Sequence, residues 1–159
     1  MVTITAAGIA GLITFIFARL QVRIAKSQRD IALDKLKFDL FQKRYEIYDA
    51  AKRLIAHVML VSDLEHSDPT KIRELYVTLD EARFYFPPAI IQLLTNLHAI
   101  CERFFAHLAQ REQISTDDTA LWNAMADTLS ADQSELRAIY ASLPEKFETA
   151  LAFKQLTVS

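Results

Sequence analysis

The chain has 159 residues, of which 52% are hydrophobic and 24% are charged, a composition that excludes a disordered chain and allows one domain with its own core. Its net charge of −2 is unevenly distributed. Residues 19–53 carry ten Lys or Arg against five Asp or Glu, whereas residues 54–159 carry eight against fifteen. Because phosphate binding requires a basic surface, the acidic distal part argues against a nucleic-acid partner.

The N-terminal segment predicts a transmembrane anchor over residues 1–24. Val2 to Ala18 contains no charged residue, and the first acid of the chain is Asp30. A cleaved signal peptide would carry its positive charge before the apolar run, which is the reverse of the order found here. By the positive-inside rule we expect a single-pass protein with its N-terminus outside and the remainder in the cytoplasm. Seventeen helical residues span only about 25 Å, so a buried core helix remains an alternative.

Two sets of residues in this segment are candidates for membrane contacts. Small side chains recur on one side of the predicted helix and favour close packing against a second copy or a partner helix, although ordinary use of small residues would give the same pattern. These residues are Thr3, Ala7, Gly11 and Thr14. Four basic residues follow and are suited to anionic lipid headgroups, or alternatively to a solvated helix face. They are Arg19, Arg23, Lys26 and Arg29.

The absence of glycine from Leu12 onward favours helices throughout the rest of the chain. Tight β-hairpins commonly need glycine at positive φ, so a chain without it is poorly suited to a sheet. We therefore predict a basic juxtamembrane helix over residues 25–37, followed by a helical bundle over residues 38–159. No proline or glycine interrupts residues 12–68, so we expect one long helix to about Glu65.

Apolar residues recur every seven positions along the later part of this long helix. The row consists of Leu33, Leu40, Ile47, Leu54 and Val61. Neighbouring apolar rows widen the arc to about 140°, more than a two-stranded coiled coil requires. The pattern therefore predicts one wall of a bundle.

Four further breaks divide the remaining sequence. Ser67-Asp68-Pro69 predicts a helix start with an Asp68 cap, and Pro87-Pro88 ends that helix and opens the next. Ser115-Thr116-Asp117 predicts the start of a fourth cytoplasmic helix, and Pro144 that of a short last one. The predicted fold is all-α: an N-terminal transmembrane helix continues into a long helix of an antiparallel four-helix-type bundle with a short C-terminal helix.

The segment from Lys35 to Tyr48 reads KLKFDLFQKRYEIY, and the later segment from Ala82 to Pro87 reads ARFYFP. These segments resemble a pattern found in small bacterial membrane proteins without an established activity. Such proteins often carry an acid where this chain has Gln42. The resemblance implies an N-terminal anchor in the bacterial inner membrane and a cytoplasmic helical domain, and it implies no catalytic residues.

The residues capable of catalysis or ligand binding form no recognisable signature. The four histidines are His57, His66, His98 and His107, and none belongs to a metal-binding motif. The single cysteine, Cys101, lies on an apolar helix face, where an inert thiol is expected. We therefore expect no catalytic residue, no metal and no cofactor. A cluster of aromatic residues could line a pocket or form ordinary core. Its members are Phe84, Tyr85, Phe86, Phe104 and Phe105.

Two functions are compatible with this sequence. The first is a membrane-anchored interaction or scaffold module without enzymatic activity, whose partners are membrane lipid and another protein or a second copy. The alternative is a ligand-sensing or enzymatic helical bundle with an internal pocket near His57, His98 and His107. A cavity at these histidines would favour the alternative, and a solid apolar core would argue against it.

Overall fold

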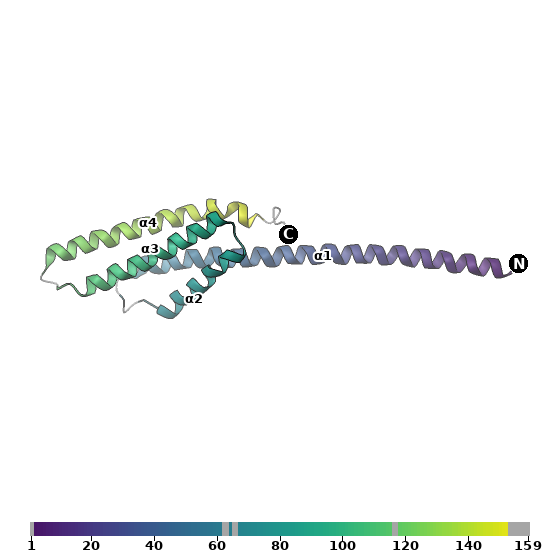
Figure 1. Cartoon of the computed structure of the whole chain (residues 1–159), viewed down its shortest axis with the longest axis horizontal. Helices are drawn as coiled ribbons and strands as arrows, with labels where there is room; N and C mark the ends of the chain where they lie inside the picture. Colours follow the sequence, from purple (N-terminus) through teal and green to yellow (C-terminus); the bar gives the residue numbers. More distant parts are fainter. Residues whose placement is uncertain (1, 62–63, 65–66, 116–117, 153–159) are drawn as a thin grey trace. The chain divides into compact units, whose positions relative to one another are not determined.

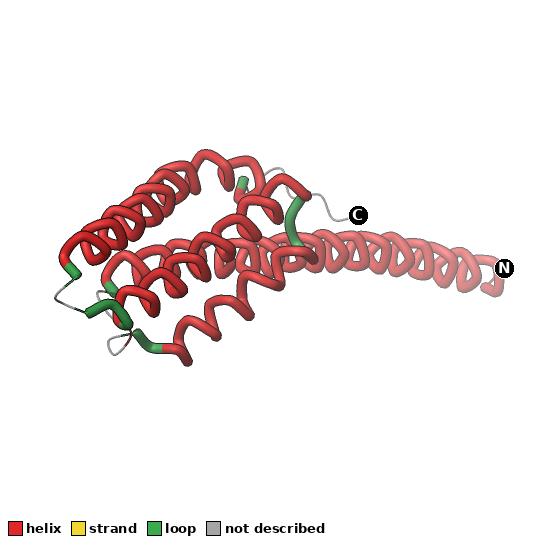
Figure 2. Tube along the Cα trace, turned by 60° about the vertical axis from the view of Figure 1, so that its left-hand side comes forward, coloured by secondary structure: helices red, strands yellow, loops and turns green. Residues whose placement is uncertain are grey.

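The computed structural model describes residues 2–61, 64, 67–115 and 118–152, with the backbone alone for residues 2–10, 12 and 13. Every regular element in these residues is helical, which confirms the all-α prediction (Figures 1 and 2). The elements are α1 (Val2–Leu60), α2 (Pro69–Asp80), the 3₁₀ helix η2 (Glu81–Phe84), α3 (Pro88–Glu112) and α4 (Thr119–Leu151).

The chain divides into two units between Asp39 and Leu40. The first unit contains the N-terminal part of α1. The second contains the remainder of α1 together with α2, η2, α3 and α4, and it holds the hydrophobic core. Within it, α3 and α4 lie side by side and run in opposite directions (Figures 1 and 2). This unit is the predicted helical bundle.

The seven-residue row of α1 enters this core in its later part. Ile47, Leu54 and Val61 are buried, whereas Leu40 is half-buried and Leu33 is exposed. Burial of a large apolar side chain contributes roughly 1.5–3 kcal/mol. The segments that follow α1 bury apolar residues against this wall, and these residues recur at helical spacing. They are Ile72, Leu75 and Leu79 of α2, Ala82 of η2, Phe86 after it, Ile90, Leu94, Leu97, Ile100, Cys101, Phe104 and Leu108 of α3, and Leu129, Leu136, Ile139, Leu143 and Phe147 of α4.

The starts of three helices follow from local sequence. The Asp68 carboxylate accepts hydrogen bonds from the amides of Thr70 and Lys71, each at 3.1 Å, and Pro69 occupies the first position of α2. Pro88 likewise begins α3. The helix α4 begins directly after the predicted start at Ser115-Thr116-Asp117, with Asp118 as its N-cap, and the Asp118 carboxylate accepts a hydrogen bond from the Leu121 amide at 3.1 Å. Thr116 and Asp117 lie outside the described residues.

The long helix ends earlier than predicted, at Leu60 instead of Glu65, which lies outside the described residues. Beyond the end, the Leu64 amide donates a 2.7 Å hydrogen bond to the carboxylate of Glu112 at the end of α3. Leu64 is half-buried and packs against the core. A tertiary contact thus satisfies a backbone group that a longer helix would have bonded internally.

The prediction of a separate helix beginning at Pro144 is wrong, because Pro144 lies inside α4. Proline cannot donate to the carbonyl four residues earlier, and this costs about 3 kcal/mol in a helix interior. On either side of it, Leu143 and Phe147 are both fully buried. Their burial, at roughly 1.5–3 kcal/mol each, offsets the cost and keeps the helix continuous.

Arg44 joins three separate segments of the bundle. Its Nε donates to the Tyr85 carbonyl and its terminal nitrogen donates to the Ala150 carbonyl, both at 2.9 Å. The guanidinium also lies 5.7 Å from the centre of the Phe86 ring. Ala150 is in the last turn of α4, where unpaired carbonyls accumulate and a cation is favoured.

Within the predicted anchor, the side chains of residues 2–10, 12 and 13 lie outside those described. Among the residues that the structure describes, no helix combines the length and the apolar character needed to cross a membrane.

Candidate functional site

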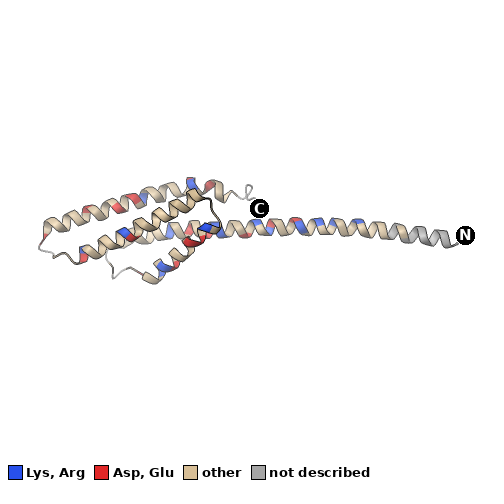
Figure 3. Ribbon diagram, viewed as in Figure 1, with Lys and Arg blue, Asp and Glu red and all other residues tan. Residues whose placement is uncertain are grey.

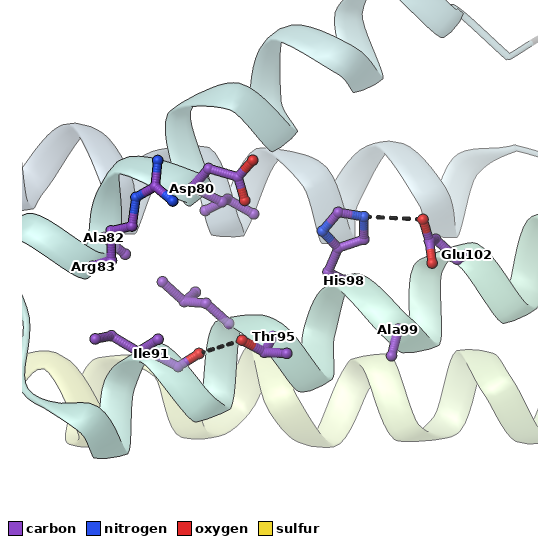
Figure 4. Close-up of a pocket in the computed structure, with 10 residues that line it drawn as sticks. Asp80, Ala82, Arg83, Ile91, Thr95, His98, Ala99 and Glu102 are labelled. Carbon is purple, nitrogen blue, oxygen red and sulfur yellow. Dashed lines mark hydrogen bonds and ion pairs between the residues drawn. The ribbon is translucent and has the colours of Figure 1, made fainter.

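A surface cleft of about 480 Å³ opens between α3 and the α2–η2 segment. Figure 4 shows Asp80 and Arg83 on one side of it, and Thr95, His98 and Glu102 along α3 on the other. The remaining lining residues are apolar and provide its floor. They are Leu79, Ala82, Ile91, Leu94 and Ala99.

His98 is held at this cleft by two contacts. Its Nε2 lies 3.2 Å from the Glu102 carboxylate, one helical turn away. Its ring also stacks on Tyr76, with the centroids 4.0 Å apart and the planes 7° from parallel. Burial, the largest effect, raises the pKa of Tyr76, and the neighbouring Cys101 and Glu102 act in the same direction. The uncharged phenol therefore stacks against the imidazole while Glu102 fixes its orientation.

The other two predicted histidines do not line this cleft. His107 lies nine residues after His98, which places it about 180° around α3. The Nδ1 atom of His107 is 2.6 Å from Asp132 of α4. His57 lies on α1, and its Nε2 is buried without a hydrogen bond to any described residue. His66 lies outside the described residues. His57, His98 and His107 therefore lie in three different environments.

Asp132 forms a buried ionic cluster that the sequence analysis missed. Its side chain is 3% exposed, and it accepts hydrogen bonds from Arg103 Nε at 2.8 Å and from His107. Arg103 also binds Glu135 at 2.7 Å, and Glu135 followed by Asp132 raises the pKa of Arg103. A signal was present, because Asp132 occupies a position in the apolar row between Leu129 and Leu136. An acid at such a position requires a cationic partner from the facing helix.

The bonds of this cluster tie α3 to α4. Cys101 is buried, and this burial raises the pKa of its thiol to about 12. In the described part of the chain no group of three or more His, Cys, Asp or Glu is placed to hold a metal ion.

The aromatic cluster is mostly core. Phe86 and Phe104 are buried, and Tyr85 and Phe105 are half-buried against the core. Phe84 is exposed, with the Arg83 guanidinium 4.9 Å from the centre of its ring.

The candidate membrane residues that the structure describes are all exposed. Arg19 places its guanidinium 4.7 Å from the centre of the Phe15 ring, and Arg29 pairs with Asp30 at 3.1 Å. Arg23 and Lys26 are also exposed. Figure 3 shows Lys and Arg in blue along this part of α1.

The small-residue positions are only partly described. Gly11 and Thr14 are exposed, and a Cβ at Gly11 would meet no atom within 4 Å. The side chains of Thr3 and Ala7 lie outside the described residues.

Comparison with protein-family models, with curated proteins and with solved structures finds no match to this chain.

Proposed function

We propose that this protein is a membrane-anchored helical interaction module of the bacterial inner membrane, with its N-terminus outside and its bundle in the cytoplasm. The observation that carries the proposal is the charge pattern of α1. Seventeen uncharged residues, Val2 to Ala18, precede four basic residues on one continuous helix. This order is typical of an anchor whose basic end stays in the cytoplasm.

Exposed apolar side chains around Ala18 support the same proposal. Phe15, Ile16, Leu20 and Val22 are all exposed on the first unit. Apolar side chains gathered in one region of a surface mark contact with a membrane or another protein. Lipid chains and the interfacial region would cover them, while the cationic ends of nearby side chains reach the headgroups.

The basic residues provide orientation at the membrane surface. Arg19, Arg23, Lys26 and Arg29 would each contribute about 1 kcal/mol next to anionic headgroups. Within the bilayer, the small side chains of Thr3, Ala7, Gly11 and Thr14 would allow a second helix to approach closely. The bundle then presents its surface to a protein partner, and no catalytic role is proposed for it.

Membrane fractionation tests this function. The full chain should sediment with membranes and resist extraction by alkaline carbonate, whereas a variant lacking residues 2–24 should be soluble. A Thr3→Cys variant on a Cys101→Ala background should react with an impermeant maleimide added outside the cell. A full chain that remains in the soluble fraction would overturn the proposal, and labelling only after lysis would overturn the orientation.

The His98 cleft favours a second candidate function, the binding of a small polar ligand. Its apolar floor and its mixture of acidic and basic side chains suit a molecule that carries both charges and a short apolar part. A screen of amino acids and related zwitterions by thermal shift tests it. The ligand that raises the melting temperature should lose its effect in His98→Ala and keep it in His57→Ala, and absence of any shift across the screen would argue against this function.

A further inference from the structure

A second seven-residue row of apolar side chains lies on α1, apart from the row that enters the bundle core. Its members, here called the Phe17 row, are Phe17, Ile24, Ile31 and Phe38, with exposed fractions of 61%, 56%, 66% and 56%. All four belong to the first unit. Leu40, the half-buried neighbour in the other row, lies two residues after Phe38 and therefore about 200° around the helix.

The seven-residue spacing of the Phe17 row is that of one of the two core positions in a coiled-coil heptad. Along a straight helix, seven residues complete about 20° less than two full turns. Each member of the row is therefore displaced slightly around the helix axis from the one before it. A left-handed supercoil of two helices removes this drift and keeps the row at the contact. An isolated helix in water is only marginally stable, so a long helical unit that buries none of these side chains lacks its main source of stability.

The charges beside the row are complementary to a second copy of the same helix. Positions three and four residues after each member flank the row. The first flanking positions carry no charge and are Leu20, Gln21, Ser27 and Gln28. The next two are Asp34 and Lys35, both exposed, and neither forms an ion pair within the described part of the chain. In a parallel dimer, the two-fold axis places Asp34 of each helix next to Lys35 of its mate.

Lipid would not cover the later half of the Phe17 row. Ile31 and Phe38 lie about 20 and 30 Å along the helix beyond Ala18, where the uncharged run ends. In the orientation proposed above, this part of α1 lies outside the bilayer. A protein surface with the same repeat is therefore needed to cover it.

We propose that residues 17–38 form a parallel two-stranded coiled coil with a second copy of this chain. The parallel orientation rests on the proposed function, because both anchors must enter the membrane from the same side. The contact itself rests only on the row and on the Asp34–Lys35 pair.

Cysteine crosslinking of the full chain in native membranes tests the face and the orientation. On a Cys101→Ala background, Ile24→Cys, Ile31→Cys and Phe38→Cys should each form a disulfide-linked dimer under mild oxidation. Leu33→Cys is the matched control on another face of the same unit and should remain monomeric. Equal crosslinking of the control, or none at the three row positions, would overturn the proposal. Crosslinking at Ile31 alone would indicate an antiparallel pair, and a product of another mass would indicate a different partner; either would also overturn it.

Charge exchange tests the complementarity independently. Asp34→Lys and Lys35→Asp should each raise the dimer dissociation constant in detergent about tenfold, because each places like charges in the seam. The double variant Asp34→Lys, Lys35→Asp should return to within about twofold of the original value, since the pair is restored. Failure of this rescue would contradict the predicted pairing.

Fractionation of the same variants separates this inference from the proposed function. Membrane-bound protein without row-specific crosslinks would refute the coiled coil and leave the anchor intact. Row-specific crosslinks in a soluble protein would refute the anchor and leave the coiled-coil contact intact.

Discussion

At the scale of single residues, Asp132 is the charged residue that is buried among those described in the bundle. Its buried carboxylate is balanced by Arg103 and His107, which are both partly exposed to solvent. A buried carboxylate without such partners would be costly, so the stability of the α3–α4 contact depends on all three groups.

Asp132→Asn should lower the free energy of unfolding by about 1–2 kcal/mol, because the amide retains the volume but loses two charge-assisted hydrogen bonds. Urea denaturation measures this change. Glu135→Gln is the matched control, since it removes an exposed carboxylate from the same cluster, and its effect should be within about 0.5 kcal/mol. Equal losses in the two variants would show that burial of Asp132 is unimportant.

The Cys101 thiol predicts how stability responds to alkaline pH. Its pKa is raised from 9.0 to about 12, mainly by burial, so the folded state favours the neutral thiol. This contribution to stability is fully present below pH 9 and is lost as the pH rises toward 12. In Cys101→Ala, the free energy of unfolding should therefore decline less steeply between pH 9 and pH 12 than in the original chain. Parallel curves from denaturant titrations across this range would contradict the assignment.

At the scale of elements, the starts of α2 and α3 are determined by neighbouring residues in the sequence, whereas the end of α1 depends on a contact with another helix. Asp68, Pro69 and Pro88 act within one turn of their own helix, so the sequence was sufficient to place the starts of α2 and α3. The end of α1 instead involves Glu112 at the far end of α3, and the continuity of α4 depends on burial around Pro144. These causes arise only after the helices have packed.

The same distinction applies to the candidate site. His98 and Glu102 are four residues apart, so their shared helix face follows from the sequence, whereas the position of Asp80 and Arg83 opposite them depends on the η2 turn. Asp132 could have been recognised from its place in an apolar row, but its partners on α3 could not be identified without the packing.

Substitution of Arg44 tests how much its hydrogen bonds to the Tyr85 and Ala150 carbonyls stabilise the bundle. Arg44→Met should lower the free energy of unfolding by about 1.5–3 kcal/mol, because two partly buried hydrogen bonds from a charged group are lost. Hydrogen exchange should also increase in the last turn of α4. The neighbouring Lys43 forms only an exposed pair with Glu46, so Lys43→Met is the control and should change stability by less than about 0.5 kcal/mol. Similar losses in both variants would rule out the proposed role of Arg44.

At the scale of the whole molecule, the all-helical architecture was predicted from the absence of glycine in most of the chain. No residue in the described segments has a positive φ, in agreement with the lack of glycine after Leu12. Helices joined by proline and aspartate caps satisfy this restriction, and a sheet with tight hairpins would not. The bundle was predicted from the sequence to start at residue 38, and the second unit starts at Leu40, although α1 has no break there.

The second unit should fold without the first, because the core residues of α1 begin at Ile47. A chain that starts at Lys35 should unfold cooperatively, with a melting temperature within about 3 °C of that of the full chain in detergent. Circular dichroism during heating measures both properties. A broad transition in the shortened chain would show that the bundle depends on the N-terminal unit.

The bonds made by Arg44 also imply an order of assembly during synthesis. The caps at Asp68 and Asp118 involve residues two or three positions ahead, so they can form as soon as each helix emerges from the ribosome. The Arg44 guanidinium must wait for Tyr85, 41 residues later, and for Ala150, 106 residues later. Closing so long a loop carries the larger entropic cost, so the bond to Ala150 forms last and marks completion of the bundle. Until then the nascent chain exposes the apolar wall of α1, and this is the stage at which a chaperone would bind it.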